Sequence, residues 1–178
     1  MRRDRTGAIH TYRTPSGRTN GLVFDHEGRL ICCEGGGAES NRRVTRIELD
    51  DEAATARLGA MLAPTFLAAG GGVLFLQGDL GAGKTTLARG FLRAAGVTGV
   101  MRSPTYTLME PYQAAGQRLL HLDLYRLVDA GEVEFLGLRD ESPDSVIWLV
   151  EWPERGQGHL PAADLSVHLL YRGSSRVA

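Results

Sequence analysis

The sequence predicts an α/β fold built around a central, largely parallel sheet. From residue 47 onward, short apolar runs alternate with helical patterns, and a glycine-rich turn joins one apolar run to the next helix. Such alternation is typical of parallel strands, because a crossover must carry the chain back before the next strand begins. The 178 residues suffice for one domain with a small appendage.

The individual elements follow from hydrophobic periodicity and from helix-capping and turn residues. A short strand at 47–49 precedes a helix capped by Asp50 or Asp51, and Pro64 is expected to kink or end that helix. A strand at 73–76 leads through the glycine-rich turn into a helix over 84–95, which Gly96 stops. Beyond it we expect a helical stretch at 130–136 and strands at 106–110, 119–122, 146–150 and 165–171.

Charge separates residues 1–46 from the rest of the chain. That segment holds nine arginines against five acids, a net charge of +4, whereas residues 47–178 carry a net charge of −5. Turn-forming residues dominate it, and one hairpin is predicted, with strands at 22–24 and 30–33. We therefore expect an appendage of hairpin or irregular structure at 1–46 and the main domain at 47–178.

The apolar runs, the cysteines and the net charge indicate which cellular compartment and which kinds of partner to expect. No apolar run is long enough for a membrane helix, and no signal-peptide core follows the arginine-rich N-terminus. The adjacent Cys32 and Cys33 suit neither an ordinary disulfide nor a zinc site. The net charge of −1 provides no broad field for nucleic acid. A cytoplasmic protein without a membrane or DNA partner is expected.

Residues 78–85 carry the strongest chemical signal. They read Gly-Asp-Leu-Gly-Ala-Gly-Lys-Thr and match the phosphate-binding pattern G-x-x-x-x-G-K-[ST] between a strand and a helix. Backbone N–H groups of such a loop surround a phosphate, Lys84 is expected to reach the β and γ phosphates, and the Thr85 hydroxyl to hold Mg²⁺. Lys84 is the only lysine among 20 basic residues, at the one position that requires a compact ammonium. The motif refines the prediction to a three-layer, P-loop NTPase-like fold.

Two acids and a hydroxyl-rich segment are candidates to complete this site. Asp123 and Glu151 each close an apolar strand, the pattern expected of carboxylates that hold a metal or orient water beside a phosphate loop. Trp152 follows Glu151 and suits either stacking on a base or partner, or ordinary packing. Residues 103–107 are either a segment that senses the γ-phosphate or a polar loop. His121 is expected to be packed or hydrogen-bonded rather than a metal ligand, because no second histidine stands at ligand spacing.

Several classes of P-loop protein are disfavoured by what the sequence lacks. No second lysine exists for the Asn-Lys-x-Asp segment that reads guanine, which argues against GTP. No Leu-Ser-Gly-Gly-Gln segment is present, and the core is too short for a two-lobed helicase. Two alternatives to an ATPase stay open. One is a small-molecule kinase whose lid would come from 126–139, and the other is a binding module that docks on a partner when nucleotide is bound.

Five segments in this order resemble the TsaE family of bacterial tRNA threonylcarbamoyladenosine synthesis, over residues 47–178. They are 78–86, 103–108, 121–127, 134–140 and 150–153. The resemblance implies a Mg²⁺-dependent ATPase of low intrinsic activity that is stimulated by its partners TsaB and TsaD. It also implies that tRNA is reached only through that complex.

The resemblance also assigns residues. It implies catalytic roles for Lys84, Asp123 and Glu151, metal binding by Thr85 and Glu151, and a looser match of Thr55 to the adenine side. The nucleotide contacts it implies are Asp79, Gly81, Ala82, Gly83, Lys84, Thr85, Thr86, Trp152 and Arg176.

Residues 1–46 show a different resemblance. Segments 19–34 and 41–46 are similar to about one blade of a gluconolactonase-type β-propeller, whereas propellers close with roughly four to eight blades. We therefore expect no independent function for 1–46. The segment is interpreted as a fused fragment or as an overextended gene start, with Val44 marking the alternative start.

Overall fold

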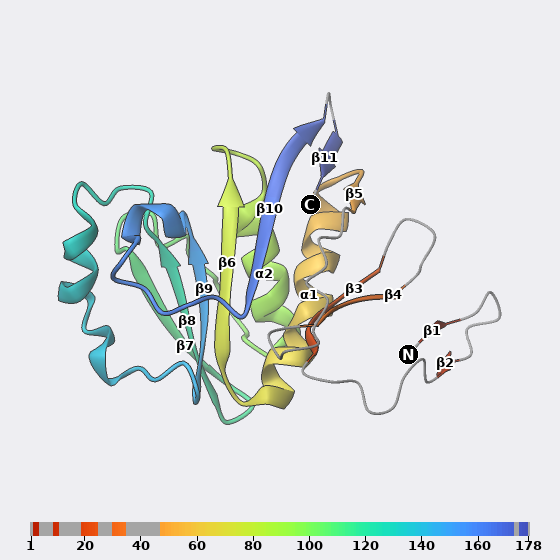
Figure 1. Ribbon diagram of the computed structural model, residues 1–178, viewed down its shortest axis with the longest axis horizontal. Coiled ribbons are helices and arrows are strands. Elements are labelled where there is room, and N and C mark those ends of the chain that lie inside the picture. Colours follow the sequence, from red (N-terminus) through yellow and green to blue (C-terminus); the bar gives the residue numbers. More distant parts are fainter. Residues whose placement is uncertain are drawn as a thin grey trace.

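The computed structural model describes the main chain of residues 47–172 and 175–177 and four short N-terminal strands, with side chains given for 47, 49–138 and 140–170. A seven-stranded sheet has the order β5-β11-β10-β6-β9-β8-β7 (Figure 1). Its four central strands run parallel, and the strands outside them join in antiparallel pairs. Their bounds are β5 Glu48–Leu49, β6 Gly72–Gly78, β7 Met109–Ala114, β8 Gln117–Asp123, β9 Val146–Glu151, β10 Leu165–Arg172 and β11 Ser175–Val177. The predicted α/β fold with a largely parallel sheet is confirmed.

Helices α1 (Glu52–Ala69) and α2 (Lys84–Ala94) pack against each other on one side of the sheet. Each helix carries a glycine at the contact, because a Cβ on Gly59 would lie 2.0 Å from the Leu87 carbonyl oxygen and one on Gly90 would lie 2.1 Å from that of Ala56. The two backbones therefore touch directly. This close approach fixes the start of α2, and with it the phosphate loop, relative to α1.

Asp51 is the N-cap of α1, and its carboxylate accepts a 2.6 Å hydrogen bond from the backbone N–H of Ala54. Of the two outcomes predicted for Pro64, an end of the helix is wrong, since α1 continues to Ala69 and its C-cap is Gly70, whose φ is +78°. A kink at Pro64 stays a prediction. Proline costs a helix about 3 kcal/mol. Burial of Ala63 and Phe66, whose ring meets that of Phe91 edge-on at 5.6 Å, offsets that cost.

The opposite side of the sheet is covered by short 3₁₀ segments rather than α-helices. They are η1 (Ala130–Leu136), η2 (Leu138–Asp140) and η3 (Pro153–Gly156). The helical stretch predicted at 130–136 is present, and a reciprocal capping box between Asp129 and Glu132 begins it. Alternate residues of β6, β8 and β9 face this second core, for example Val73, Leu122 and Val150. The third layer of the fold is therefore thin.

The predicted strand at 106–110 is wrong in its position. Residues 104–108 form a turn that is closed by a 2.6 Å bond from the Leu108 N–H to the Pro104 carbonyl, and β7 begins only at Met109. Strand β7 then forms a tight antiparallel hairpin with β8 through Ala115 and Gly116. Both turn residues have positive φ, +50° and +78°, as a type I′ turn requires. Alanine rarely occupies such a position, which is why the sequence did not reveal the hairpin.

Among the N-terminal strands, β3 (Thr19–Phe24) and β4 (Leu30–Glu34) pair antiparallel, which confirms the predicted hairpin. Strands β1 (Arg2–Arg3) and β2 (Ile9–His10) form a second antiparallel pair. The propeller resemblance, the alternative start at Val44 and the division at residue 46 stay predictions, and the side chains of Cys32 and Cys33 lie outside those described.

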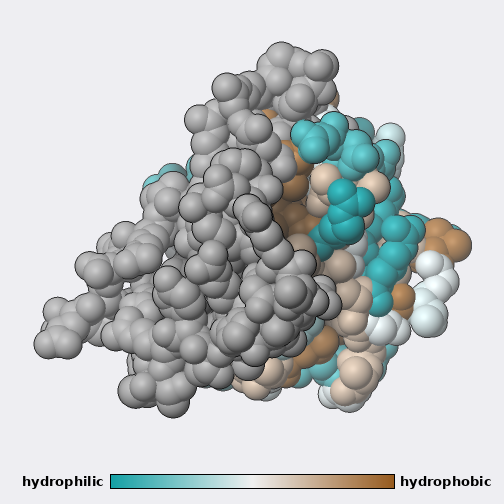
Figure 2. Space-filling view, turned by 90° about the vertical axis from the view of Figure 1, so that its right-hand side faces the viewer, coloured by the Kyte–Doolittle hydropathy of each residue, from teal (hydrophilic) through white to brown (hydrophobic). Residues whose placement is uncertain are grey.

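Within the described part of the chain, no helix is long and apolar enough to cross a membrane. On the coloured surface that Figure 2 presents, hydrophilic residues lie beside apolar ones.

Candidate functional site

The loop between β6 and α2 forms the centre of the candidate site. Gly78 has φ +132°, and a Cβ there would lie 2.2 Å from the Leu169 carbonyl oxygen of β10. Gly83, which precedes α2, has φ +108°. Only glycine adopts such geometry readily, so the loop can turn sharply from strand into helix and leave its backbone N–H groups accessible.

Lys84 lies at the first turn of α2 and is almost entirely buried, with 4% of its surface exposed. Its ammonium group donates to the carbonyl oxygens of Gly78 at 2.7 Å and Asp79 at 2.8 Å, and it lies 3.8 Å from the centre of the Trp152 ring. The loop and the tryptophan thus hold the ammonium inside the site.

The same burial alters the acidity of Lys84. Desolvation lowers the pKa of its ammonium group below the ordinary lysine value, while the negative charges of Glu151, Asp123 and other nearby acids act in the opposite direction. Because burial removes water from the ammonium group, its attraction for an anion would be stronger than at the protein surface, whereas the neighbouring carboxylates would oppose the anion.

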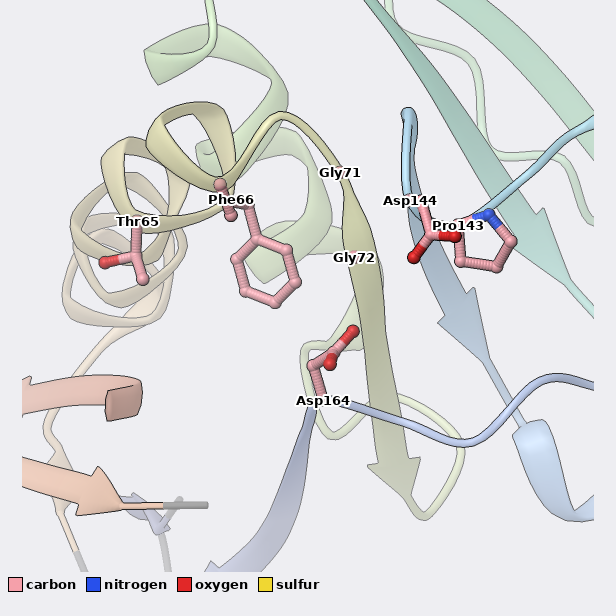
Figure 3. A pocket seen from close by; sticks show the side chains of 8 residues that line it. Thr65, Phe66, Gly71, Gly72, Pro143, Asp144 and Asp164 are labelled. Carbon is pink, nitrogen blue, oxygen red and sulfur yellow. The ribbon is translucent and has the colours of Figure 1, made fainter. Parts of the chain in front are cut away.

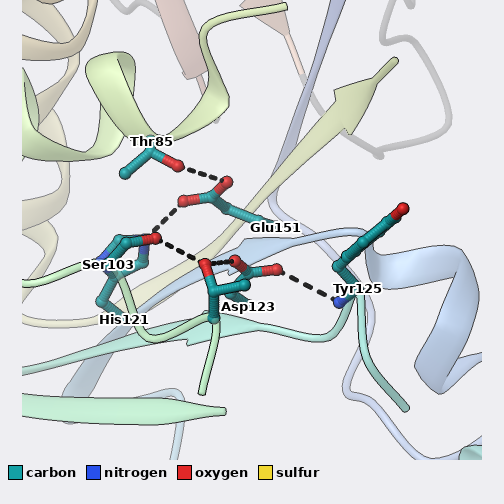
Figure 4. A network of polar contacts seen from close by, with 7 residues as sticks. Thr85, Ser103, His121, Asp123, Tyr125 and Glu151 are labelled. Carbon is teal, nitrogen blue, oxygen red and sulfur yellow. Dashed lines mark hydrogen bonds and ion pairs between the residues drawn. The ribbon is translucent and has the colours of Figure 1, made fainter. Parts of the chain in front are cut away.

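Glu151 ends β9 and lies between β6 and β8, in register with Leu76 and Asp123. Its Oε2 accepts a hydrogen bond of 2.9 Å from the Thr85 hydroxyl, and its Oε1 lies 2.8 Å from Nε2 of His121 (Figure 4). Only 2% of Glu151 and none of His121 is exposed. The expectation that His121 is a packed, hydrogen-bonded residue is confirmed.

Asp123 ends β8 beside Glu151, and each of its two carboxylate oxygens has a partner. Oδ2 accepts from the Thr105 hydroxyl at 2.8 Å, and Oδ1 accepts from the backbone N–H of Tyr125 at 3.1 Å. The Thr105 hydroxyl also lies 2.8 Å from that of Ser103. The segment 103–107 is therefore bonded directly to one of the two predicted acids (Figure 4).

Trp152 adopts a left-handed backbone conformation, φ +58° and ψ +48°, which is uncommon for a residue with a large side chain. Its backbone N–H donates a 3.2 Å hydrogen bond to the Leu76 carbonyl oxygen, and the centre of its ring lies 4.9 Å from that of Tyr125. In this conformation the indole ring lies against the ammonium group of Lys84.

A cavity of about 250 Å³ gathers most of the predicted residues. Those that line it are Gly81, Gly83, Lys84, Thr85, Thr86, Asp123, Glu151 and Trp152, together with Glu52, Leu80, Thr105 and Tyr125. Sequence reasoning did not identify Glu52, whose carboxylate accepts from the Thr86 hydroxyl at 3.3 Å. Glu52 is the first residue of α1, far from the phosphate loop in the sequence, and it belongs to no recognised motif.

Asp79, Ala82 and Thr55 were also predicted, but they are not among the residues that line this cavity. Asp79 contributes its carbonyl to Lys84, and Ala82 is buried within the loop. Thr55, predicted on the adenine side, is fully buried and its hydroxyl bonds the Asp51 carbonyl, so it does not line the cavity. Arg176 belongs to β11, but its side chain lies outside those described.

A second cavity, of about 240 Å³, lies near Gly72, at the other end of β6 (Figure 3). Phe66, Asp144 and Asp164 point toward it. The Asp164 carboxylate accepts a 2.8 Å bond from the Val73 N–H, so it serves to begin the strand. The chemistry-bearing residues are concentrated at the first cavity, at the carboxyl ends of β6, β8 and β9.

Comparison with known proteins agrees with this arrangement. The fold resembles the crystal structure of YdiB from Bacillus subtilis, with a TM-score of 0.53 and 26% sequence identity, and the match covers 77% of this chain and 85% of that chain. The protein named tRNA threonylcarbamoyladenosine biosynthesis protein TsaE in Haemophilus influenzae is 52% identical over 104 residues. The match covers 58% of this chain and 66% of that relative.

The protein of the same name from a Nostoc species is 40% identical over 133 residues, which cover 72% of this chain and 80% of the relative. Residues 49–177 match the family model described as threonylcarbamoyl adenosine biosynthesis protein TsaE. The match includes the phosphate loop and all three strands whose ends form the cavity. The chain belongs to the TsaE family.

Proposed function

We propose that this chain is a Mg²⁺-dependent subunit that binds and hydrolyses ATP in tRNA N6-threonylcarbamoyladenosine modification, together with TsaB and TsaD. The proposal rests above all on one contact, the 2.9 Å bond between the Thr85 hydroxyl and the Glu151 carboxylate beside the phosphate loop. Family membership supports the pathway. The partners, the reaction and the indirect contact with tRNA are parts of the proposal.

The residues present fit a magnesium ion. Mg²⁺ prefers oxygen ligands and is usually bound by one or two protein oxygens together with substrate phosphates. Thr85 Oγ1 and Glu151 Oε2 offer a hydroxyl and a carboxylate in contact with each other. Among the described residues, no group of three or more histidine, cysteine, aspartate or glutamate side chains forms a complete metal cage. That donor set suits a metal that arrives with the nucleotide.

Each remaining group has a role in this proposal. Lys84 and the N–H groups of the loop bind phosphate oxygens and stabilise the negative charge that moves during phosphoryl transfer. Mg²⁺, when bound, neutralises charge on the same phosphates. Asp123 keeps free lone pairs beyond its bonds to Thr105 and Tyr125, so it can accept a hydrogen bond from the attacking water and orient it.

The test is ATP turnover by the full chain with Mg²⁺, alone and with the matching TsaB and TsaD proteins. We expect slow release of free phosphate that rises when both partners are added. The Lys84→Ala variant should lose tight nucleotide binding and turnover. Phosphate transferred to a small acceptor would instead support a kinase. Partner-independent turnover would contradict the tRNA-modification role, and unchanged nucleotide affinity in Lys84→Ala would contradict the site.

A further inference from the structure

His121 is fully buried and hydrogen-bonded to Glu151, the proposed metal ligand, and the mechanism above does not use it. It lies on β8, two residues before Asp123, and none of its surface is exposed. Its Nε2 lies 2.8 Å from Oε1 of Glu151, while the other oxygen of that carboxylate accepts from Thr85. One carboxylate thus connects a buried histidine to the hydroxyl at the start of α2.

The chemistry of the pair fixes the direction of this hydrogen bond. An ionised carboxylate only accepts hydrogen bonds, so Nε2 of His121 must carry the proton that it shares with Glu151. Nδ1 is also buried and has no hydrogen-bond partner among the described atoms. A proton on Nδ1 would leave a buried donor unpaired, which is costly, whereas a ring that carries its proton at Nε2 leaves only an unpaired acceptor at Nδ1.

Without the contact from His121, little would fix the orientation of the Glu151 carboxylate. Its backbone is held between β6 and β8, and among the described residues its carboxylate is hydrogen-bonded to the His121 side chain on one oxygen and to that of Thr85 on the other. A Mg²⁺ ion held by Thr85 and Glu151 would be bound by the carboxylate oxygen that faces Thr85, Oε2. The bond from His121 then remains as the contact that orients the carboxylate.

We propose that His121, as the Nε2-protonated tautomer, is a positioning residue that holds the Glu151 carboxylate toward Thr85 and so sets the Mg²⁺ affinity of the site. The inference rests on the proposed function, because it concerns the metal of that same site. Groups that orient metal ligands from behind typically change metal affinity or activity by about 10- to 100-fold when removed. His121 itself does not line the cavity, and it contacts the site through Glu151, which does.

The experiment measures ATP affinity of the full chain by calorimetry, with Mg²⁺ and with a chelator. Mg²⁺ is expected to tighten ATP binding by the wild type. In His121→Leu and His121→Asn, we expect the Mg²⁺ concentration that gives half of this effect to rise about 10- to 100-fold. The affinity for ATP measured in the presence of chelator should be unchanged. The longer amide of His121→Gln reaches the Nε2 position and should restore most of the effect, whereas that of His121→Asn is too short. If His121 had only a structural role, the Gln and Asn variants would not be expected to differ in their response to Mg²⁺ in this way.

His159 provides a matched control. Its Nδ1 also pairs with a glutamate, Glu134 at 3.1 Å, but this pair is on the surface and outside the cavity. His159→Leu should leave the Mg²⁺ dependence of ATP binding unchanged. Circular dichroism establishes that each variant is folded.

A second measurement needs no variant. Nitrogen NMR of histidine-labelled wild-type protein distinguishes the tautomers, and the His121 signal should report protonation at Nε2 and not at Nδ1. Protonation at Nδ1 alone, or a normal Mg²⁺ response in folded His121→Leu, would overturn the inference. If Mg²⁺ fails to tighten ATP binding even in the wild type, the proposed function itself fails, a result distinct from failure in the His121 variants alone.

Discussion

The hydroxyl of Thr105 donates a 2.8 Å hydrogen bond to Oδ2 of Asp123, which ties the turn at 104–108 to the end of β8. The backbone reinforces this connection, since the Asp123 N–H bonds the Leu108 carbonyl at 3.0 Å. A segment expected to respond to the γ-phosphate therefore contacts the acid proposed to orient water. Movement of either group would alter the other's position.

The first prediction follows from this bond. Thr105→Val keeps the side-chain volume but removes the donor, so Asp123 loses a partner that fixes its orientation. Turnover should fall by about 10- to 100-fold, the range expected for a hydrogen bond to a charged group, with little change in ATP affinity. Steady-state phosphate release and calorimetry give the two values. Thr107→Val is the control, because the Thr107 hydroxyl donates to Glu110 at 3.1 Å and not to Asp123. Equal turnover in the two variants would exclude a role of Thr105 in orienting Asp123.

The second prediction concerns the metal ligand. Glu151→Gln keeps the shape of the side chain but removes the negative charge next to Thr85. Tightening of ATP binding by Mg²⁺ should be lost, and turnover should fall by about 100-fold or more, as for other groups that act on transition-state charge. Binding of ATP in chelator should persist. If Glu151→Gln keeps its Mg²⁺ response while Asp123→Asn loses it, Asp123 is the metal ligand instead.

The third prediction uses the fact that Lys84 is the chain's single lysine, so lysine-labelled protein gives one side-chain NMR signal. Desolvation lowers the pKa of this ammonium, so it loses its proton at a pH below the ordinary value of about 10.4. ATP affinity should decline over the same alkaline range, because the neutral amine attracts phosphate weakly. A titration midpoint at or above the ordinary value would show that the nearby carboxylates outweigh burial.

The fourth prediction tests the contact between α1 and α2. In a helix without close neighbours, Gly→Ala stabilises by about 1 kcal/mol. At Gly90 the added Cβ would lie 2.1 Å from the Ala56 carbonyl oxygen, so the helices must separate. We expect Gly90→Ala to lower the free energy of unfolding by about 1–3 kcal/mol in urea titrations. An increase in stability would mean that the two backbones do not touch.

Much of the candidate site could be predicted from the sequence because its signals are local. The phosphate loop depends on consecutive glycines and on the strand and helix that flank it, all within one stretch of chain. The acids Asp123 and Glu151 could be identified because each directly follows an apolar strand. Parallel strands bring their carboxyl ends to one edge, so the two acids meet there.

Other features depend on residues that are distant in sequence. Glu52 enters the cavity from α1, and neither its spacing nor its neighbours mark it. The continuation of α1 past Pro64 depends on burial of Phe66 against α2, which overrides a strong local preference. The β7–β8 hairpin has alanine at a position where asparagine or glycine would have indicated the turn.

The sequence by itself determined the α/β class, the phosphate loop and the identities of Lys84, Thr85, Asp123 and Glu151, since each follows from the residues next to it. Only the tertiary structure decided that His121 bonds Glu151, that Thr105 bonds Asp123 and that Gly59 and Gly90 bring two helices together. These contacts are set by strand register and helix packing. Strand register and helix packing bring side chains from distant segments of the chain into contact. A local sequence pattern does not show which distant residues will meet in this way.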